Sequence, residues 1–481
     1  MAVGRTGSKH PVKIFANIFI SFIGAGVLGL PFAFKEAGIL EGIFVMATIG
    51  IISVKAMLLL IDCKYKLISE YRLPRNEKAK VETSPKKVQE TDAKEDGLLS
   101  LQVAKQEFVN LITEEEVNKE EDPGHDLSYG DVGFYAIGYH GRLLVDLAIV
   151  ISQTGFCCAY LIFITENLSD YMRSMKLIHW LLILLPPICF MTLLRHLGSL
   201  AMTSLMAQCS NLLAFAVVFW FDFEHFEHVE IHPKKMSIVG LPFFICIAIY
   251  CYEGAGMILS LESSLAKEVR KQFKTYFIFT MFIVTFLYIS FGSAGYLSFG
   301  PQTDEIITLN LPKGDSLDFA VIVKSLLCLA LFFTYPVMMF PVMKILEGYL
   351  MSNPEKHIWR GNALRVIMVL ITGMVVMVIP NFATLMALVG ATCCTMLAFV
   401  LPGLFHMTIF KGSLTIYEVI IDWTLMFIGI VGAIIGTIDA FKRLSNAPSD
   451  EVVLPANLTA TVGHIVSNIM GNITTVKSPS P

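Results

Sequence analysis

The chain has 481 residues, of which 55% are hydrophobic and only 16% are charged, and its mean hydropathy is +0.65. Soluble domains carry about 25% charged residues, so this composition excludes an ordinary soluble protein and predicts one that lies in a lipid bilayer. The formal net charge of −4 is spread over polar segments and predicts no nucleic acid partner. The sequence holds no nucleotide-binding or nucleophile motif, and we therefore expect no enzyme.

Eleven apolar runs are long enough to cross a hydrocarbon core of about 30 Å. In chain order they lie near 14–34, 43–61, 143–167, 178–194, 199–221, 237–259, 275–297, 319–346, 364–380, 382–408 and 418–440. We therefore expect an all-α, multi-pass membrane protein with eleven transmembrane helices and with its ends on opposite sides. Lys and Arg are about twice as frequent in the segments that become cytosolic if the N-terminal end is inside.

These spans divide the chain into one membrane domain and three polar segments. We expect a cytosolic segment over 1–13, a transmembrane domain over 14–62 and 128–441, a cytosolic and mostly disordered loop over 63–127, and a lumenal or extracellular tail over 442–481.

The loop and the tail carry signals of their own. The loop begins with basic residues, Lys64 and Lys66 among them, which fits a position near anionic lipid. Apolar residues at helical spacing over 98–112 predict either a short amphipathic helix or a loop with transient helicity. In the tail, Asn457 and Asn472 begin glycosylation sequons, which fits an outer location.

The triplet Gly24-Ala25-Gly26 in the first span returns 230 residues later as Gly254-Ala255-Gly256 in the sixth. A span broken by small residues leaves backbone groups unpaired, which lipid cannot satisfy but a substrate in a protein-lined cavity can. Two such breaks, each in the first of five spans, predict a 5+5 inverted repeat with the eleventh span as an extra helix. The alternatives are coincidence and small-residue packing between helices.

The two breaks predict different halves of one binding site. The amides near Gly24 to Gly29, at the start of a half-helix, suit an anion such as a carboxylate. The second break adds Glu253, which could carry a coupling proton or accept hydrogen bonds from a substrate ammonium group. The alternative is a purely structural Glu253 that bonds the unwound backbone.

Further polar and aromatic side chains within the spans are candidates for the cavity wall. We favour Tyr160, Tyr252 and Thr334, although packing is the alternative for each. The ten cysteines fall almost wholly within spans, so neither a disulfide nor a metal site is expected. An outer-loop patch with three histidines predicts either a pH-responsive, weakly metal-binding site or a solvated loop: His225, His228 and His232.

Several long stretches resemble the amino acid/auxin permease family, and most of all its plant vacuolar neutral amino acid transporters and animal proton-coupled amino acid transporters. They are FANIFISFIGAGVLGLPFAFKEAG, YGDVGFYAIGYHGRLLVDLAIVISQTGFCCAYLIFITENL, YEGAGMILSLE, FFTYPVMMFPV and IPNFATLMALVGA. The resemblance covers the membrane portion, about 14–62 and 128–441. It implies a LeuT-like fold and secondary transport of small neutral amino acids, with a proton as the usual coupling ion.

Within this resemblance the broken first and sixth helices fall on Gly24, Ala25, Gly26, Val27 and Gly29, and on Tyr252, Glu253, Gly254 and Gly256. Animal proton-coupled members carry a histidine seven residues before the first glycine, where this chain has Asn17. Coupling through that histidine is therefore unavailable, which leaves Glu253, another group, or no coupling.

The sequence therefore predicts a secondary active transporter of small neutral L-amino acids that needs no cofactor and works by alternating access with a proton as coupling ion. We expect it in a vacuolar or lysosomal membrane rather than the plasma membrane. Two alternatives stay open: a sodium-coupled carrier, and an amino acid sensor that recruits cytosolic partners through 64–127.

Overall fold

Helices make up the regular secondary structure of the described part of the chain, and no strand occurs there. The computed structural model describes residues 10–81, 127–171, 175–193, 215–220, 237–266, 268–311, 319–351 and 357–446. The predicted 98–112 segment, the three-histidine patch and both sequons lie outside these ranges.

The first half of the chain contains two helices that are interrupted near their middle. Its elements are α1 (Pro11–Phe22), the 3-10 turn η1 (Ala25–Gly29), α2 (Leu30–Ala37), α3 (Ile39–Val81), α5 (Tyr129–Ile137), α6 (Tyr139–Tyr171), α7 (Leu177–Thr192), α9 (Leu241–Cys251) and α10 (Ala255–Ser263).

The second half is built from longer helices and one stack with π-helical turns. Its main elements are α11 (Phe273–Phe299), α12 (Phe319–Leu350), α13 (Ile358–Val378), α14 (Phe382–Val389), the π-turns η6 (Gly390–Cys394) and η7 (Met396–Val400), α15 (Leu401–Ile409) and α16 (Ile416–Asn446).

Eight helical segments of the described chain are long and apolar enough to cross a membrane. A ninth is formed if α1 and the segment Ala25–Ala37, which are bent by 51°, are taken as one span, and Leu177–Thr192 is a shorter apolar helix. These helices coincide with ten of the predicted runs, except that most end several residues later. Of the remaining run, 199–221, only a helical stretch over 215–220 is described.

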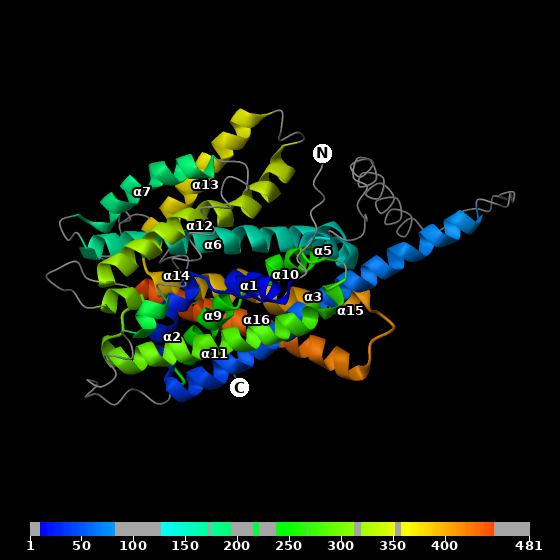
Figure 1. Cartoon of the computed structure of the whole chain (residues 1–481), viewed down its shortest axis with the longest axis horizontal. Coiled ribbons are helices and arrows are strands. Elements are labelled where there is room, and N and C mark those ends of the chain that lie inside the picture. The colour runs from blue at the N-terminus through cyan, green and yellow to red at the C-terminus, as the bar shows by residue number, and fades with distance from the viewer. Residues whose placement is uncertain are drawn as a thin grey trace, which may run out of the picture.

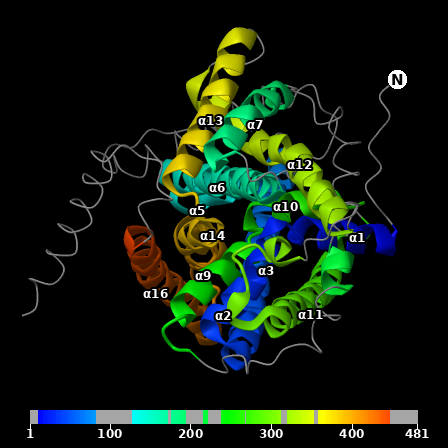
Figure 2. The same ribbon diagram turned by 90° about the vertical axis from the view of Figure 1, so that its left-hand side faces the viewer.

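The helices form an elongated bundle with their axes along its long direction (Figure 1). Viewed end-on, α9 and α14 lie near the centre, whereas α16 lies at the periphery (Figure 2). Only 22% of the apolar window of α16 is buried, against 72% for the span Leu241–Ser263. The broken helix α9–α10 is therefore surrounded by protein, and α16 presents most of its apolar surface outward, as a lipid-facing helix does.

The predicted loop does not begin at residue 63, because α3 continues as a helix to Val81. Lys64 is fully buried, so it is not a lipid-facing cation, and its Nζ lies 2.7 Å from the equally buried Glu262 of α10. The same ammonium group donates to the Ser263 hydroxyl at 2.6 Å, and Tyr65 donates to the second oxygen of Glu262 at 2.8 Å. Pairing with Glu262 thus allows Lys64 to be buried, although the sequence predicted that this residue is exposed.

Replacing Lys64 with Met should lower the free energy of unfolding by about 3–5 kcal/mol, because Glu262 would remain charged and buried without its partner. Lys66→Met is the matched control: its pair with Glu70 is partly exposed and should contribute less than about 1 kcal/mol. Thermal unfolding of the purified full chain measures both. Equal losses for the two variants would contradict the assigned role of the buried pair.

Candidate functional site

The first break separates α1 from η1 at Ile23 and Gly24. Gly24 has an extended backbone, with φ −122° and ψ −175°, so the helical hydrogen bonds stop at Phe22 and a new turn starts at Ala25. The first amides of this turn, those of Ala25 and Gly26, have no preceding helical carbonyl to bond. The break therefore places the first amides of a short helix, and its positive end, at buried positions within the bundle.

The second break lies between Cys251, the last residue of α9, and Ala255, the first of α10. It contacts the first break directly: a Cβ built on Gly254 would lie 2.4 Å from the Phe22 ring. Gly26 lies against the end of α9, because its Cβ would be 3.1 Å from the Cys251 sulfur and from the Tyr250 ring. Glycine in both triplets thus permits the close approach of the two broken helices.

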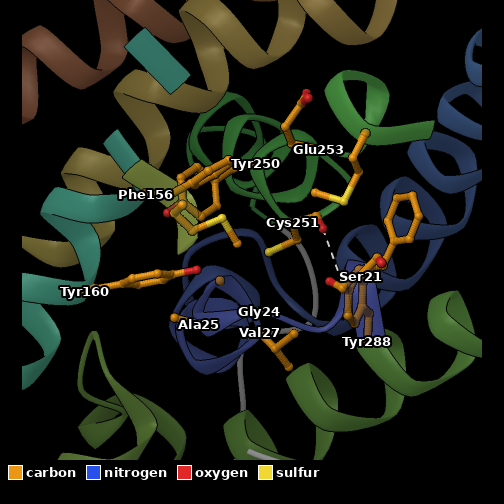
Figure 3. Close-up of a pocket in the computed structure, with 14 residues that line it drawn as sticks. Ser21, Gly24, Ala25, Val27, Phe156, Tyr160, Tyr250, Cys251, Glu253 and Tyr288 are labelled. Carbon is orange, nitrogen blue, oxygen red and sulfur yellow. Dashed lines mark hydrogen bonds between the residues drawn. The ribbon is translucent and has the colours of Figure 1, made fainter. Parts of the chain in front are cut away.

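A cavity of about 440 Å³, including its mouth, opens where the two breaks meet. Figure 3 shows the α1–η1 segment on one side of it and the end of α9 on the other. Among the described residues that line it, Glu253 is the one charged side chain. The lining consists of Ser21, Phe22, Gly24, Ala25, Gly26, Val27, Phe156, Tyr160, Tyr250, Cys251, Glu253, Met257, Tyr288 and Met338.

Tyr288 of α11 joins the ends of both broken helices. Its hydroxyl lies 2.5 Å from the Phe22 carbonyl, at the end of α1, and 3.2 Å from the Cys251 carbonyl, at the end of α9. The side chain is fully buried. Its single proton is therefore shared between two helix-terminal carbonyls that lipid would leave unpaired, with the shorter bond to Phe22.

Glu253 lies in the gap between α9 and α10, and only 7% of it is exposed. Its carboxyl group accepts hydrogen bonds from the backbone N–H groups of Ala255 and Gly256, the first amides of α10. Its Oε2 atom is buried and has no hydrogen-bond partner within the described chain. Glu253 thus caps a half-helix with one part of its carboxyl group and keeps an acceptor available with the other.

The structure brings some of the predicted residues to the cavity and places others elsewhere. Gly24, Ala25, Gly26, Val27, Tyr160 and Glu253 line it. The Tyr252 hydroxyl instead donates to Thr285 of α11 at 2.9 Å and to the Met46 carbonyl of α3, so its side chain points away from the cavity.

Four further predicted residues also lie outside the cavity lining. Thr334 donates to Ala330 of its own helix at 2.8 Å. Gly29 faces Met386 and Phe382 of α14, Gly254 faces the Phe22 ring, and Gly256 faces Ile149 of α6.

Tyr288 is the important residue that the sequence did not single out. It stands in an apolar run with other aromatic residues, and nothing local distinguishes it from Tyr276, which lies 12 residues before it on the same helix. Recognising Tyr288 from the sequence would require knowledge of which face of α11 contacts the two broken helices. Over the described ranges, no group of three His, Cys, Asp or Glu side chains could hold a metal ion.

Comparison with known proteins matches a family model described as transmembrane amino acid transporter protein over residues 8–78 and 109–442. The chain is 31% identical to "Amino acid transporter ANT1" of Arabidopsis thaliana, covering 89% of this chain and 91% of the relative. It is 32% identical to "Amino acid transporter AVT3C" of the same plant, covering 90% of each.

Solved structures give a weaker likeness. A Na+-coupled sialic acid symporter aligns with 91% of this chain and 97% of its own, at 10% identity and a TM-score of 0.44.

Gly254→Ala should lower the free energy of unfolding by about 1–3 kcal/mol, because its methyl group would overlap the buried Phe22 ring. Gly256→Ala is the matched control in the same triplet, since its Cβ would meet nothing closer than 3.8 Å. Thermal unfolding of the purified chain should separate the two variants. The contact between the breaks would be refuted if both were tolerated alike.

Tyr288→Phe should cost about 1–3 kcal/mol of unfolding free energy, because two buried carbonyl groups would lose their donor. Tyr276→Phe on the same helix removes a hydroxyl that only meets Gln272 near the surface, and should change stability by less than about 0.5 kcal/mol. The measurement is again thermal unfolding, and an unchanged Tyr288→Phe variant would contradict the bridging role.

Proposed function

The chain belongs to the family of transmembrane amino acid transporters, and on this premise we propose that it is a secondary active transporter of small neutral L-amino acids, coupled to protons. Membership in this family also means that the protein carries amino acids across a membrane and is not an enzyme. The observation that carries the finer proposal is the cavity at the meeting point of two broken helices.

The substrate carboxylate binds the bare amides at the start of η1, near Ala25 and Gly26. The lining residues of the cavity include no Lys or Arg, so backbone dipoles have to hold the negative group. A second carboxylate on the substrate would meet Glu253 without a compensating cation, and a cationic side chain would enter apolar and aromatic walls. Both arguments favour a neutral side chain.

The substrate ammonium group binds on the opposite side, where α1 and α9 end. The Phe22 and Cys251 carbonyls converge there on the Tyr288 hydroxyl, and Glu253 offers a free acceptor. An ammonium group has three donors, so it can bond these acceptors while Tyr288 retains one of them. Phe156, Tyr160 and Tyr250 form the wall for the substrate side chain.

Alternating access follows from an inverted 5+5 repeat with eleven spans, in which 199–221 supplies the span that the described residues leave incomplete. In this proposal α1, α2, α3, α9, α10 and α11 rock against the other helices around the cavity. Tyr288 then keeps the two broken helices together, because it bonds the ends of both.

Glu253 is the residue that we assign to proton coupling. It is the charged side chain of the lining, and it lies next to the proposed ammonium position. Loss of the proton would leave a buried charge that no cation of the lining pairs, so Glu253 crosses the membrane protonated together with the substrate and releases the proton where the cavity opens to the less acidic side. Sodium is the alternative coupling ion.

The proposed location is a vacuolar or lysosomal membrane, with amino acid moving from the acidic lumen to the cytosol. The tail, with Asn457 and Asn472, is then lumenal and glycosylated, and the loop that follows α3 is cytosolic, where it is available to cytosolic partners.

Proteoliposomes that contain the full chain should take up radiolabelled L-alanine faster when the amino acid side is acidic, and replacement of sodium by choline should leave uptake unchanged. Glu253→Gln should abolish the acceleration by acid, because the side chain can no longer exchange a proton. Glu70→Gln, a half-exposed site on α3, serves as the matched control.

Three results would count against parts of this proposal. Dependence on sodium would replace the coupling ion, and normal acid stimulation of Glu253→Gln would remove Glu253 from coupling. Amino acid binding with no flux at any pH would favour a sensor over a carrier.

A further inference from the structure

A second pair of ionisable side chains lies away from the cavity, between α15 and α16. The Nδ1 atom of His406 is 2.7 Å from Oδ2 of Asp422. His406 is 4% exposed and Asp422 is fully buried, and both belong to helices apolar enough to span the membrane. Ionisable groups are costly in this position, so their presence indicates a function.

The carboxyl group of Asp422 is only half satisfied. Its Oδ1 atom is buried and has no hydrogen-bond partner in the part of the chain that the structure describes. A carboxylate placed solely for stability would be expected to use both oxygens. One acceptor is therefore held next to His406 and the other remains open to a proton or water.

The titratable and charged groups near this pair lie on α3, α5 and α16. On α16, Glu418 interacts electrostatically with His406 and also with Lys55 of α3. On α3, Cys63 interacts with Asp422.

The other two neighbours reach the pair through aromatic rings. Lys66 of α3 lies 5.9 Å from the Phe410 ring, which is 4.7 Å from the His406 ring. On α5, Tyr129 meets the edge of Phe405 and donates to the Leu397 carbonyl. None of these neighbours contributes a cation that bonds Asp422 among the described contacts, so the charge of the pair depends on its own proton.

The pair has two charge states with the same hydrogen bond. When the pair holds its proton, His406 is an imidazolium and Asp422 a carboxylate, and their charges sum to zero. When the proton is lost, His406 is neutral and the pair carries one buried negative charge. A buried unpaired charge favours any conformation that admits water. Proton binding therefore stabilises the closed packing of α15 on α16 that the structure shows.

The position of the pair connects this packing to the broken helices. α15 continues the stack of α14 and the two π-turns, and packs against α3. Within that stack, at the start of η6, Gly390 is so close to α9 that its Cβ would lie 2.0 Å from the Cys246 carbonyl. Movement of α15 is thus passed on to both α3 and α9, which belong to the proposed rocking group.

We propose that His406 and Asp422 form a proton-binding site, separate from the amino acid cavity, that sets the transport rate according to pH. The inference rests on the proposed transport function for its rate effect, but proton binding at the pair does not depend on that function. It differs from coupling at Glu253 because it acts on the rate at equal pH on both sides, where no proton gradient drives uptake.

The test compares exchange of L-alanine by the wild-type chain and by the double variant His406→Gln with Asp422→Asn, which cannot bind a proton at this pair. Proteoliposomes have equal pH inside and outside, from about 5.5 to 7.5, where histidines titrate. A single proton site changes the wild-type rate by up to about tenfold per pH unit, and the double variant should lose this component. His357→Gln, at an exposed histidine, is the control and should keep the wild-type profile.

Two further measurements keep the inference testable if the double variant does not fold. The exchanged variant His406→Asp with Asp422→His retains the pair and should regain the pH profile. Infrared difference spectra of the purified chain between the same pH values should contain a shift of a carboxylate band that Asp422→Asn removes, because the charge of the bonded imidazole changes.

The outcomes separate the two proposals. The inference would be overturned if the double variant kept the wild-type pH profile of exchange, or if the exchanged variant showed a flat one. Spectra without the carboxylate shift would overturn it too. Absence of alanine exchange by the wild-type chain, with the carboxylate shift present, would contradict the transport function and leave the proton site supported.

Discussion

The hydroxyl group of Tyr288 holds together the two interrupted helices on which the site depends. Each interruption exposes carbonyl groups at a helix end, and a membrane offers no donor for them. Tyr288, on a third helix, shares its one hydroxyl proton between the last carbonyl of α1 and the last carbonyl of α9. The cavity persists because the protein supplies this donor in place of water.

Buried ionisable groups also hold the second half of the sixth span in place. Lys64 stands at the end of α10 and neutralises Glu262, which fixes the second half of the broken helix to α3. At the start of α10, Glu253 binds the first amides. A nine-residue helix is thus held at both ends by ionisable groups, one of which borders the cavity. Displacement of either end has consequences for the other, because the helix between them is short and rigid.

Much of the architecture was predictable from the sequence, because apolar runs and glycine breaks are local signals. The runs located ten helices, and the repeated triplets located both interruptions. Long-range contacts were not predictable. Lys64 looked like a solvated charge because its partner lies 198 residues away, and Tyr288 looked like its neighbours because its role depends on two distant carbonyls. Tyr252 was expected at the cavity wall because it adjoins Glu253 in sequence, but its hydroxyl bonds the Met46 carbonyl of α3 instead.

Transport as proposed depends on main-chain groups at the two interruptions that bind the substrate. The most direct test is an experimentally determined structure of the full chain with bound L-alanine. We expect the carboxylate within hydrogen-bond distance of the Ala25 and Gly26 amides and the ammonium group beside the Cys251 carbonyl. Alanine bound elsewhere, or at this cavity through side chains alone, would contradict it.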